Sequence, residues 1–244
     1  MALWSGEAVH VHSIAAQVHG RYLVDRPDGD GPFPLIVGFH GYAERAEHML
    51  EAMQRLRGDR AWLLVSVQAL NRFYTRSQEI VGNWMTREDR ELAIADNIAY
   101  VAGAVAAVRR DYPTTAHLVY AGFSQGVAMA YRALAFAAEQ NPSAGPGFSP
   151  DIHVPPPVGG ILLAGDVPPD VAVRLGSLPA LLIGRGTRDE WYTESKAAAD
   201  LALFAAAGVS PQIHVFDGGH VWDDAFIGAA GQFLDGTRLS RAIR

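Results

Sequence analysis

The sequence predicts a protein of the α/β class, built on a mostly parallel sheet of eight strands with helices on both faces. Short apolar runs alternate with longer runs of helical periodicity, which is the pattern of parallel strands connected by helices. The chain has 244 residues, of which 49% are hydrophobic and 19% charged, so it is long enough to bury one large core. No repeat or linker divides it, and we expect residues 1–244 to form a single domain.

The expected strands are an opening hairpin and six buried runs. Residues 9–24 have the alternation of a hairpin, with His10 and His12 in period two. The buried runs are short and apolar, as in strands that are covered on both faces. They are residues 35–40, 62–67, 118–123, 160–164, 180–184 and 212–216.

Five helices and two long loops are expected between these strands. In the longest helix, Thr86 and Asp89 have the spacing of a capping box, and Pro113 prevents its continuation. Residues 70–84 form a loop that mixes aromatic and basic side chains, and residues 141–158 contain six prolines, which indicate a surface loop. The helices are expected at residues 44–57, 86–110, 124–140, 193–207 and 223–235.

Composition and charge exclude several classes of function. The net charge is −6 and no run of Lys or Arg is present, so nucleic acid is not expected as a partner. The chain has no cysteine, which excludes disulfides and thiolate nucleophiles. The start lacks the pattern of a secretory signal, and the smooth apolar stretch at residues 98–108 is shorter than the ~20 residues that span a bilayer. We expect a cytoplasmic protein without a membrane span. The sequence does not decide between a monomer and a homodimer.

The segment Gly122-Phe123-Ser124-Gln125-Gly126 predicts a catalytic serine. It follows an apolar strand and opens a helix, which is the context of a nucleophile elbow. The sharp turn forces the serine into a strained backbone conformation, and side chains two residues away would collide, so both flanking positions are glycine. Ser124 is therefore expected to stand free at the carboxyl edge of the sheet, where the Gln125 amide can face developing negative charge.

A serine hydroxyl needs a base that is oriented by a third group. His220 follows the last apolar strand on a glycine-rich loop, and Asp189 follows the preceding strand in the same way. We expect His220 to be the base and Asp189 the acid. Asp166, which also follows a strand, is the main rival to Asp189, and the other acidic candidates are Glu190, Asp217 and Asp223.

The segment His40-Gly41-Tyr42 closes an apolar strand at the position of the second oxyanion donor. Gly41 lets the backbone turn so that the Tyr42 amide faces the same point as the Gln125 amide, while His40 is expected to hold the loop by hydrogen bonds. The pair His10 and His12 resembles a metal pair on a strand, but no further ligand completes it. We therefore expect neither a metal nor a cofactor.

These motifs resemble the α/β-hydrolase superfamily, and most of all its phospholipase/carboxylesterase branch, which includes acyl-protein thioesterases. The resemblance runs from about residue 35 to residue 234 and implies the α/β-hydrolase fold, with Ser124 as nucleophile, His220 as base, Asp189 as acid, and Tyr42 and Gln125 as oxyanion donors. The chain departs from the branch at Val127, at Ala43-Glu44 and at Trp191-Tyr192, where the branch usually has glycine, Gly-Asp and Val-Pro.

The resemblance implies a serine esterase that acts on a small-molecule carboxylic ester or thioester. A peptidase of the prolyl-oligopeptidase type shares the elbow and the order of the three residues, and a catalytically silent binding protein with the same fold is the alternative from another class. Aromatic side chains around the predicted site suggest a pocket with an aromatic rim. They are Phe73, Tyr74, Trp84, Trp191, Tyr192 and Trp222.

Overall fold

The structure is a computed structural model that describes residues 10–139 and 154–242. A seven-stranded sheet runs through it in the order β1-β3-β2-β6-β7-β8-β9, and a separate hairpin pairs β4 with β5. In the large sheet, β1 is antiparallel to β3 and all other neighbours are parallel. The strands are β1 (Arg21–Asp25), β2 (Phe33–Phe39), β3 (Leu63–Gln68), β4 (Asn71–Tyr74), β5 (Ile80–Asn83), β6 (Thr114–Phe123), β7 (Gly159–Leu163), β8 (Ala180–Gly186) and β9 (Gln212–Phe216).

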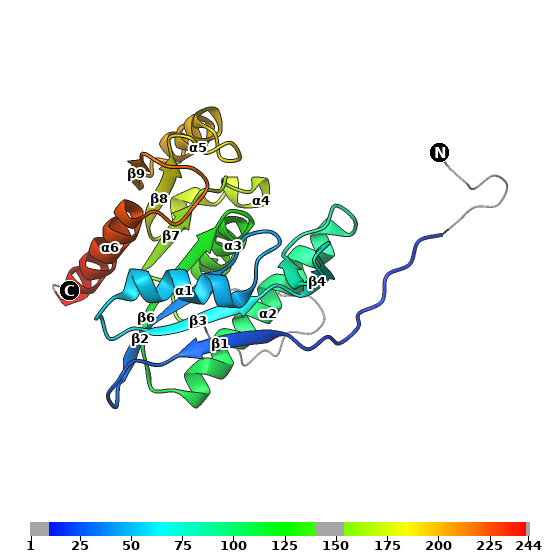
Figure 1. Cartoon of the computed structure of the whole chain (residues 1–244), viewed down its shortest axis with the longest axis horizontal. Helices are drawn as coiled ribbons and strands as arrows, with labels where there is room; N and C mark the ends of the chain where they lie inside the picture. Colours follow the sequence, from blue (N-terminus) through cyan, green and yellow to red (C-terminus); the bar gives the residue numbers. More distant parts are fainter. Residues whose placement is uncertain (1–9, 140–153, 243–244) are drawn as a thin grey trace.

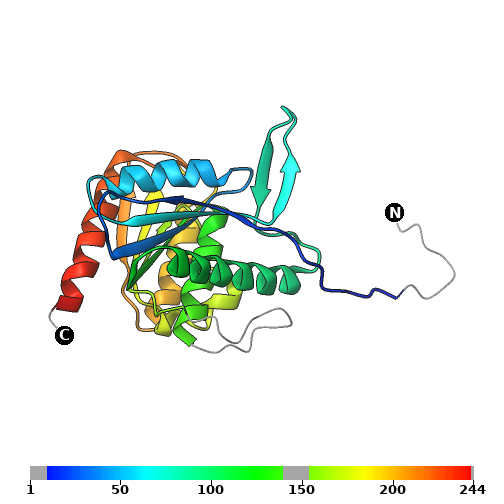
Figure 2. The same cartoon turned by 90° about the horizontal axis from the view of Figure 1, so that it is seen from below.

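Helices cover both faces of the large sheet, as Figures 1 and 2 show. On one face, α1 and α6 pack over a core that includes Met53 and Phe226, and on the other face α2, α3 and α5 pack over a core that includes Val105 and Phe204. The helices are α1 (Ala46–Arg57), α2 (Arg90–Asp111), α3 (Gln125–Glu139), the short α4 (Pro169–Ala172) with the 3₁₀ turn Leu175–Ser177, α5 (Glu194–Ala206) and α6 (Asp224–Ala242).

Burial on both faces explains why the central strands are uninterrupted apolar runs. Every residue of β2 and of β3 is buried, and parallel strands in this position have no solvent face that would require alternation. All parallel strands end at the same edge of the sheet, so the loops after β2, β6, β8 and β9 are brought together there.

The sheet has one strand fewer than expected, because the predicted opening hairpin is not formed within the described residues. Residues 1–9 lie outside them, residues 10–20 have no regular structure, and only β1 pairs with the sheet. Val11, Ile14 and Val18 are 85%, 93% and 64% exposed. Their alternation therefore has no neighbouring strand to pack against, and Figure 1 shows this segment extending away from the body.

Two predicted loops have different outcomes. Residues 70–84 are largely a β-hairpin, in which β4 and β5 pair from Asn71 opposite Asn83 to Tyr74 opposite Ile80. Of the proline-rich loop at 141–158, residues 141–153 lie outside the described residues, and residues 154–158 have no regular structure.

The long helix α2 begins at Arg90, four residues later than expected. Asp89 has a left-handed backbone (φ 48°) and makes no side-chain cap, and Thr86 donates its hydroxyl to the carbonyl of Glu88 instead of forming the predicted capping box. By length and composition alone this helix could cross a membrane. Its buried side, which includes Val101, Val105 and Val108, packs in the core beside α3, as the core helices of α/β proteins do.

Candidate active site

Ser124 lies at the turn from β6 into α3 and has a left-handed backbone, with φ 53°. This conformation costs an L-residue about 1–2 kcal/mol, so it persists only where the surroundings impose it. The Ser124 amide donates to the carbonyl of Leu163 on β7 (2.9 Å), and the Ser124 carbonyl accepts from the Val127 amide (3.0 Å). The neighbouring strand and the first turn of the helix thus hold the serine at the carboxyl edge of the sheet.

Close backbone contacts explain the glycines on both sides of Ser124. A Cβ atom at Gly122 would lie 2.6 Å from the carbonyl oxygen of Gly126, and one at Gly126 would lie 2.1 Å from the carbonyl oxygen of Phe39. Both partners are backbone atoms that have no freedom to move aside. The Gly-x-Ser-x-Gly spacing is therefore a packing requirement of this turn, as the sequence predicted.

The structure brings Asp189 and His220 into direct contact. The distances from His220 Nδ1 to the Asp189 carboxylate oxygens are 2.9 and 3.0 Å. The Asp189 side chain is fully buried, and its Oδ1 also accepts the amides of Trp191 (2.8 Å) and Tyr192 (2.9 Å). Because the carboxylate is the acceptor, the hydrogen-bond network assigns the proton to Nδ1 of His220 and leaves the lone pair on Nε2, as a general base requires.

The imidazole of His220 lies beside the elbow without a hydrogen bond to Ser124. Within residues 10–139 and 154–242, no hydrogen bond joins the Ser124 hydroxyl to His220. The ring of His220 packs on the ring of Phe123, the residue before the serine, with their centroids 4.9 Å apart. The predicted base therefore packs on the residue next to the predicted nucleophile, and catalytic hydrogen bonds are often long or absent in structures without substrate.

Within the described residues, the backbone amides of Tyr42 and Gln125 have no hydrogen-bond acceptor of their own. The Gly41 amide donates to Glu44 Oε2 (2.7 Å), and the Ala43 amide donates to the carbonyl of Gly82 (3.0 Å). Within the part of the chain that the structure describes, the Tyr42 amide between them has no acceptor. The Gln125 amide is the first of α3 and has no intrahelical partner. Both residues were predicted as oxyanion donors, and that role stays a prediction.

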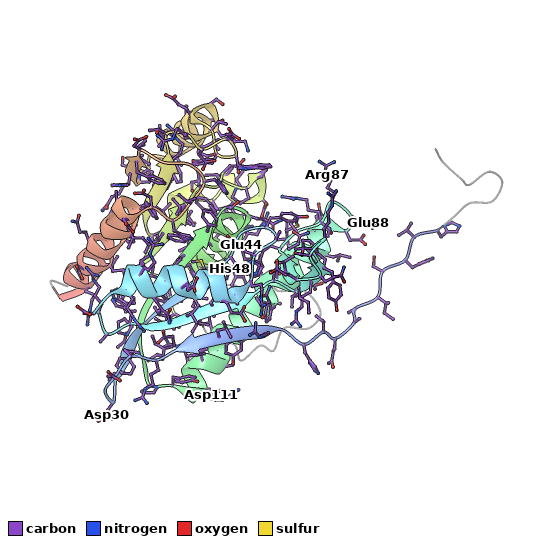
Figure 3. All side chains as sticks on the ribbon, in the orientation of Figure 1. Asp30, Glu44, His48, Arg87, Glu88 and Asp111 are labelled. Atoms are coloured by element: carbon purple, nitrogen blue, oxygen red, sulfur yellow. The ribbon has the colours of Figure 1, made fainter. Side chains whose placement is uncertain are left out.

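Glu44 is a site residue that sequence reasoning did not identify. Its carboxylate accepts the Gly41 amide, and its backbone pairs with Gly82 on β5, where the Gly82 amide donates to the Glu44 carbonyl (2.8 Å). Glu44 lies two residues before α1, and Figure 3 labels it close to His48 of that helix. Glu44 thus connects Gly41 to β5, and the only signal in the sequence was an acidic residue three positions after Gly41.

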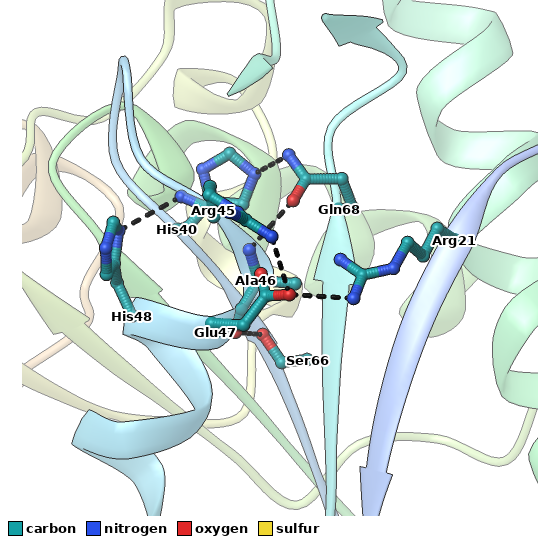
Figure 4. A network of polar contacts seen from close by, with 8 residues as sticks. All are labelled: Arg21, His40, Arg45, Ala46, Glu47, His48, Ser66 and Gln68. Carbon is teal, nitrogen blue, oxygen red and sulfur yellow. Dashed lines mark hydrogen bonds and ion pairs between the residues drawn. The ribbon is translucent and has the colours of Figure 1, made fainter. Parts of the chain in front are cut away.

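His40 stabilises the loop that contains Gly41 and Glu44 by hydrogen bonds, as the sequence predicted. Its Nε2 accepts the Ala69 amide (3.1 Å) and the side-chain amide of Gln68 (3.0 Å), so its Nδ1 carries the proton and donates to the carbonyl of Gly41 (2.7 Å). Burial lowers the pKa of His40 to about 4. Figure 4 shows how Gln68 extends this network to the start of α1, where Gln68 Oε1 accepts the Ala46 amide (2.9 Å).

The hairpin β4–β5 is attached to the elbow through the side chain of Gln125. The Gln125 Oε1 atom accepts the Trp84 amide (2.9 Å), and its Nε2 donates to Asn83 Oδ1 (2.6 Å). Within the hairpin, Phe73 on β4 stacks on Tyr42 with ring centroids 5.5 Å apart. The predicted pocket loop thus packs beside residues 40–44, here called the oxyanion loop after the role predicted for Tyr42.

The predicted aromatic rim divides into surface and core residues. Phe73 and Trp222 are half-buried, and Tyr74 and Trp191 are 66% and 73% exposed, so these four stay candidates for contact with substrate. Trp84 and Tyr192 are 1% and 2% exposed and do not line an open pocket. Instead, Trp84 packs edge-on against Phe39 and donates its indole N–H to the carbonyl of His40 (2.8 Å).

The rival acids are placed elsewhere. Asp166 pairs with Lys196 (3.3 Å) and its side chain is 56% exposed, while Asp217 pairs with Arg188. Asp223 accepts the Ala225 amide at the start of α6 (2.8 Å), and Glu190 is exposed. Among the residues that the structure describes, no three His, Asp or Glu side chains gather in a metal-binding arrangement.

Several solved structures with a similar architecture are esterases or thioesterases. Acyl-protein thioesterase 2 of Zea mays is 19% identical, with a TM-score of 0.63 over 90% of this chain and 99% of that one. Esterase PE8 is 20% identical (TM-score 0.64, 89% and 98% covered), and the Bacillus cereus carboxylesterase is 15% identical (TM-score 0.64, 89% and 94% covered). No protein-family model and no curated protein matches the sequence.

The chain has the α/β-hydrolase fold. In α/β hydrolases the nucleophile, the acid and the base follow one another along the chain on loops at the carboxyl edge of the sheet. Ser124 after β6, Asp189 after β8 and His220 after β9 occupy such loops in that order.

Proposed function

We propose that the protein is a serine hydrolase that cleaves carboxylic esters, including thioesters, through an acyl-enzyme on Ser124. The observation that carries this proposal is the buried Asp189 carboxylate bonded to Nδ1 of His220 (2.9 Å), whose ring lies beside the elbow that holds Ser124. Acyl transfer requires a serine together with a base that a third group orients, and the bond from Asp189 to His220 supplies this orientation.

In the first half-reaction, Ser124 Oγ attacks the carbonyl carbon of the ester as Nε2 of His220 accepts the hydroxyl proton. The carbonyl oxygen becomes negative and receives hydrogen bonds from the amides of Tyr42 and Gln125. Asp189 stabilises the imidazolium that forms. The intermediate then collapses, the C–O or C–S bond breaks, and the alcohol or thiol leaves with the proton from His220.

Water completes the cycle. His220 removes a proton from a water molecule, the hydroxyl attacks the acyl carbon, and the carboxylic acid leaves as Ser124 regains its proton. Each step uses only side chains and amides of this chain. We propose that Tyr42, Phe73, Tyr74, Trp191 and Trp222, which are exposed or half-buried, contact the acyl or alcohol group of the substrate.

The test combines hydrolysis of short p-nitrophenyl esters with labelling by a fluorophosphonate, which reacts only with an activated serine. Ser124→Ala and His220→Ala should lower kcat by at least about 10³-fold, and Asp189→Asn should lower it by a similar order. Labelling should be found on Ser124 by mass spectrometry. Asp166→Asn is the matched control, because this aspartate pairs with Lys196, and it should keep full activity.

Three outcomes contradict the proposal. An unlabelled, inactive wild-type protein would be a binding protein with the hydrolase fold. Cleavage of aminoacyl amides without cleavage of esters or thioesters would indicate a peptidase. Loss of activity in Asp166→Asn, with activity retained in Asp189→Asn, would show that the acid is Asp166 and not Asp189.

A further inference from the structure

Asp200 of α5 is a buried carboxylate that the mechanism above does not use. It is 6% exposed. Its Oδ2 atom accepts the phenolic hydroxyl of Tyr192 (2.9 Å) and the backbone amide of Val167 (3.1 Å). The two donors lie on the segments that follow β8 and β7, so one oxygen connects two loops of the carboxyl edge.

Tyr192 carries this connection to the acid. The Tyr192 amide donates to Asp189 Oδ1, the atom that also receives the Trp191 amide. A single residue therefore binds Asp200 through its side chain and Asp189 through its backbone. Since Asp189 bonds to Nδ1 of His220, α5 is connected to the proposed base by hydrogen bonds that meet at the two ends of Tyr192.

The burial of Asp200 is costly. Burial raises its pKa, and the one lysine nearby, Lys196, forms its ion pair with Asp166 instead. Burial and the neighbouring Asp200 carboxylate also raise the pKa of Tyr192 well above its ordinary value, so the phenol stays protonated and is the donor. A buried carboxylate without an ion-pair partner is expensive unless its hydrogen bonds do something that an apolar side chain would not.

We propose that Asp200 is a positioning residue, which acts through Tyr192 to hold the Asp189 carboxylate against His220. The proposal rests on the function proposed above. The tyrosine hydroxyl fixes the turn at residues 189–192, and the turn aims the two amides that orient the carboxylate. The role needs an acceptor at Asp200 and a hydroxyl at Tyr192, and the negative charge of Asp200 itself is not required.

Two deletions and one rescue test this role. Tyr192→Phe removes only the hydroxyl, Asp200→Ala removes the acceptor, and Asp200→Asn keeps an oxygen that accepts both donors. Loss of a hydrogen bond of this kind should lower kcat for p-nitrophenyl acetate roughly 3- to 10-fold in the first two variants, with KM unchanged within about twofold. Asp200→Asn should keep kcat within about twofold of the wild type.

Tyr100→Phe is the matched control. Like Tyr192→Phe, it deletes one tyrosine hydroxyl. The Tyr100 hydroxyl donates to the carbonyl of Arg21 (2.7 Å) and so links α2 to β1, away from residues 189–192. Tyr100→Phe should lower stability without changing kcat. If Tyr192→Phe and Tyr100→Phe leave kcat equally unchanged, or if both lower it equally, the proposal is wrong.

A second measurement does not depend on hydrolysis. The Nδ1 proton of His220, bonded to a buried carboxylate, should give a low-field proton resonance that disappears in His220→Gln. The resonance should weaken or exchange faster in Tyr192→Phe and Asp200→Ala, and persist in Asp200→Asn and Tyr100→Phe. Should the wild type prove inactive, the proposed function fails, but a resonance that still depends on Tyr192 and Asp200 upholds the positioning role. A resonance that is unchanged in both deletions overturns it.

Discussion

At the scale of single residues, backbone geometry and protonation shape the site as much as the reactive groups do. Ser124 and Ala43 both have left-handed backbones, with φ 53° and 57°. In the serine this conformation exposes the hydroxyl. In Ala43 it turns the oxyanion loop back to Gly82, and the strain is a cost that the hydrogen bonds of the loop must offset.

Ala43→Gly should stabilise the protein by about 0.5–1 kcal/mol. Glycine avoids the cost of about 1–2 kcal/mol that a left-handed backbone imposes on an L-residue, and its larger entropy in the unfolded chain offsets part of this gain. Denaturant unfolding measures the difference. The exposed helical residue Ala198 is the control, because glycine there should destabilise by about 1 kcal/mol. If both variants are destabilised alike, the strain at Ala43 is not significant.

His40 makes stability depend on pH. Its pKa is about 4 in the folded protein, because burial disfavours the charged ring, against 6.5 without burial. The unfolded chain therefore binds more protons between these values, and stability must fall as the pH decreases from about 6.5 toward 4, by an amount of the order of 3 kcal/mol.

The measurement is the free energy of unfolding of the wild type and of His40→Gln from pH 7 to pH 4. The difference between the two proteins should shrink as the pH decreases, since the glutamine does not titrate. A difference that stays constant across this range would show that His40 does not contribute to the pH dependence.

At the scale of elements, the hairpin β4–β5 and the residue after it combine a buried aromatic side chain with one that is partly exposed. Trp84, directly after β5, is buried beneath the oxyanion loop, whereas Phe73 on β4 stacks on Tyr42 nearer the surface. The two aromatic residues belong to the same segment of sequence, but their environments predict different phenotypes.

Trp84→Ala should destabilise the protein by about 3–5 kcal/mol, since it leaves a large cavity and an unpaired carbonyl at His40. Phe73→Ala should leave stability nearly unchanged and raise KM for bulky aryl esters while sparing acetate esters. Thermal unfolding and a series of ester substrates separate the two effects. Unchanged KM for all esters in Phe73→Ala would remove the hairpin from the substrate site.

At the scale of the whole molecule, the site exists because adjacent strands bring distant segments to one edge. Beyond β8 and β9, the Thr187 amide donates to the carbonyl of Phe216 (2.9 Å) and the Arg188 amide to that of Gly218 (2.8 Å). These bonds continue the pairing of the strands into the two loops that present Asp189 and His220. The positions of Asp189 and His220 relative to each other therefore depend on the register in which these two backbone segments pair.

Gly186→Ala tests this register. A Cβ atom at Gly186 would lie 2.4 Å from the carbonyl oxygens of both Gly218 and Gly219. The alanine must therefore push the loop that carries His220 away from the loop that carries Asp189. We expect a loss of about 1–3 kcal/mol in stability and a large decrease in kcat. Gly228→Ala on α6, where a Cβ atom meets nothing within 4 Å, should be fully active and slightly more stable. Equal activity in both variants would contradict the shared register.

The sequence by itself determined the class of fold and the order of most of its elements. Six apolar runs became β2, β3, β6, β7, β8 and β9, with β6 beginning four residues earlier than expected. The central strands are apolar because both of their faces are covered. The last run was wrongly expected to be buried, because β9 lies at the edge of the sheet and is mostly exposed. The glycines around Ser124 were readable because a sharp turn leaves no room for side chains. Such local requirements are visible in a single sequence.

Only the tertiary structure decided which residues meet. Three features depend on contacts between segments far apart in the chain or on which side of a loop faces inward. They are the burial of Trp84 and Tyr192, the contacts of Glu44, and the connection from Asp200 to Asp189. The predicted opening hairpin failed for the same reason, because residues 10–20 alternate but find no partner strand. Hydrophobic period and turn chemistry are properties of neighbours in sequence, whereas burial and hydrogen-bond partners arise only when the sheet brings its loops together.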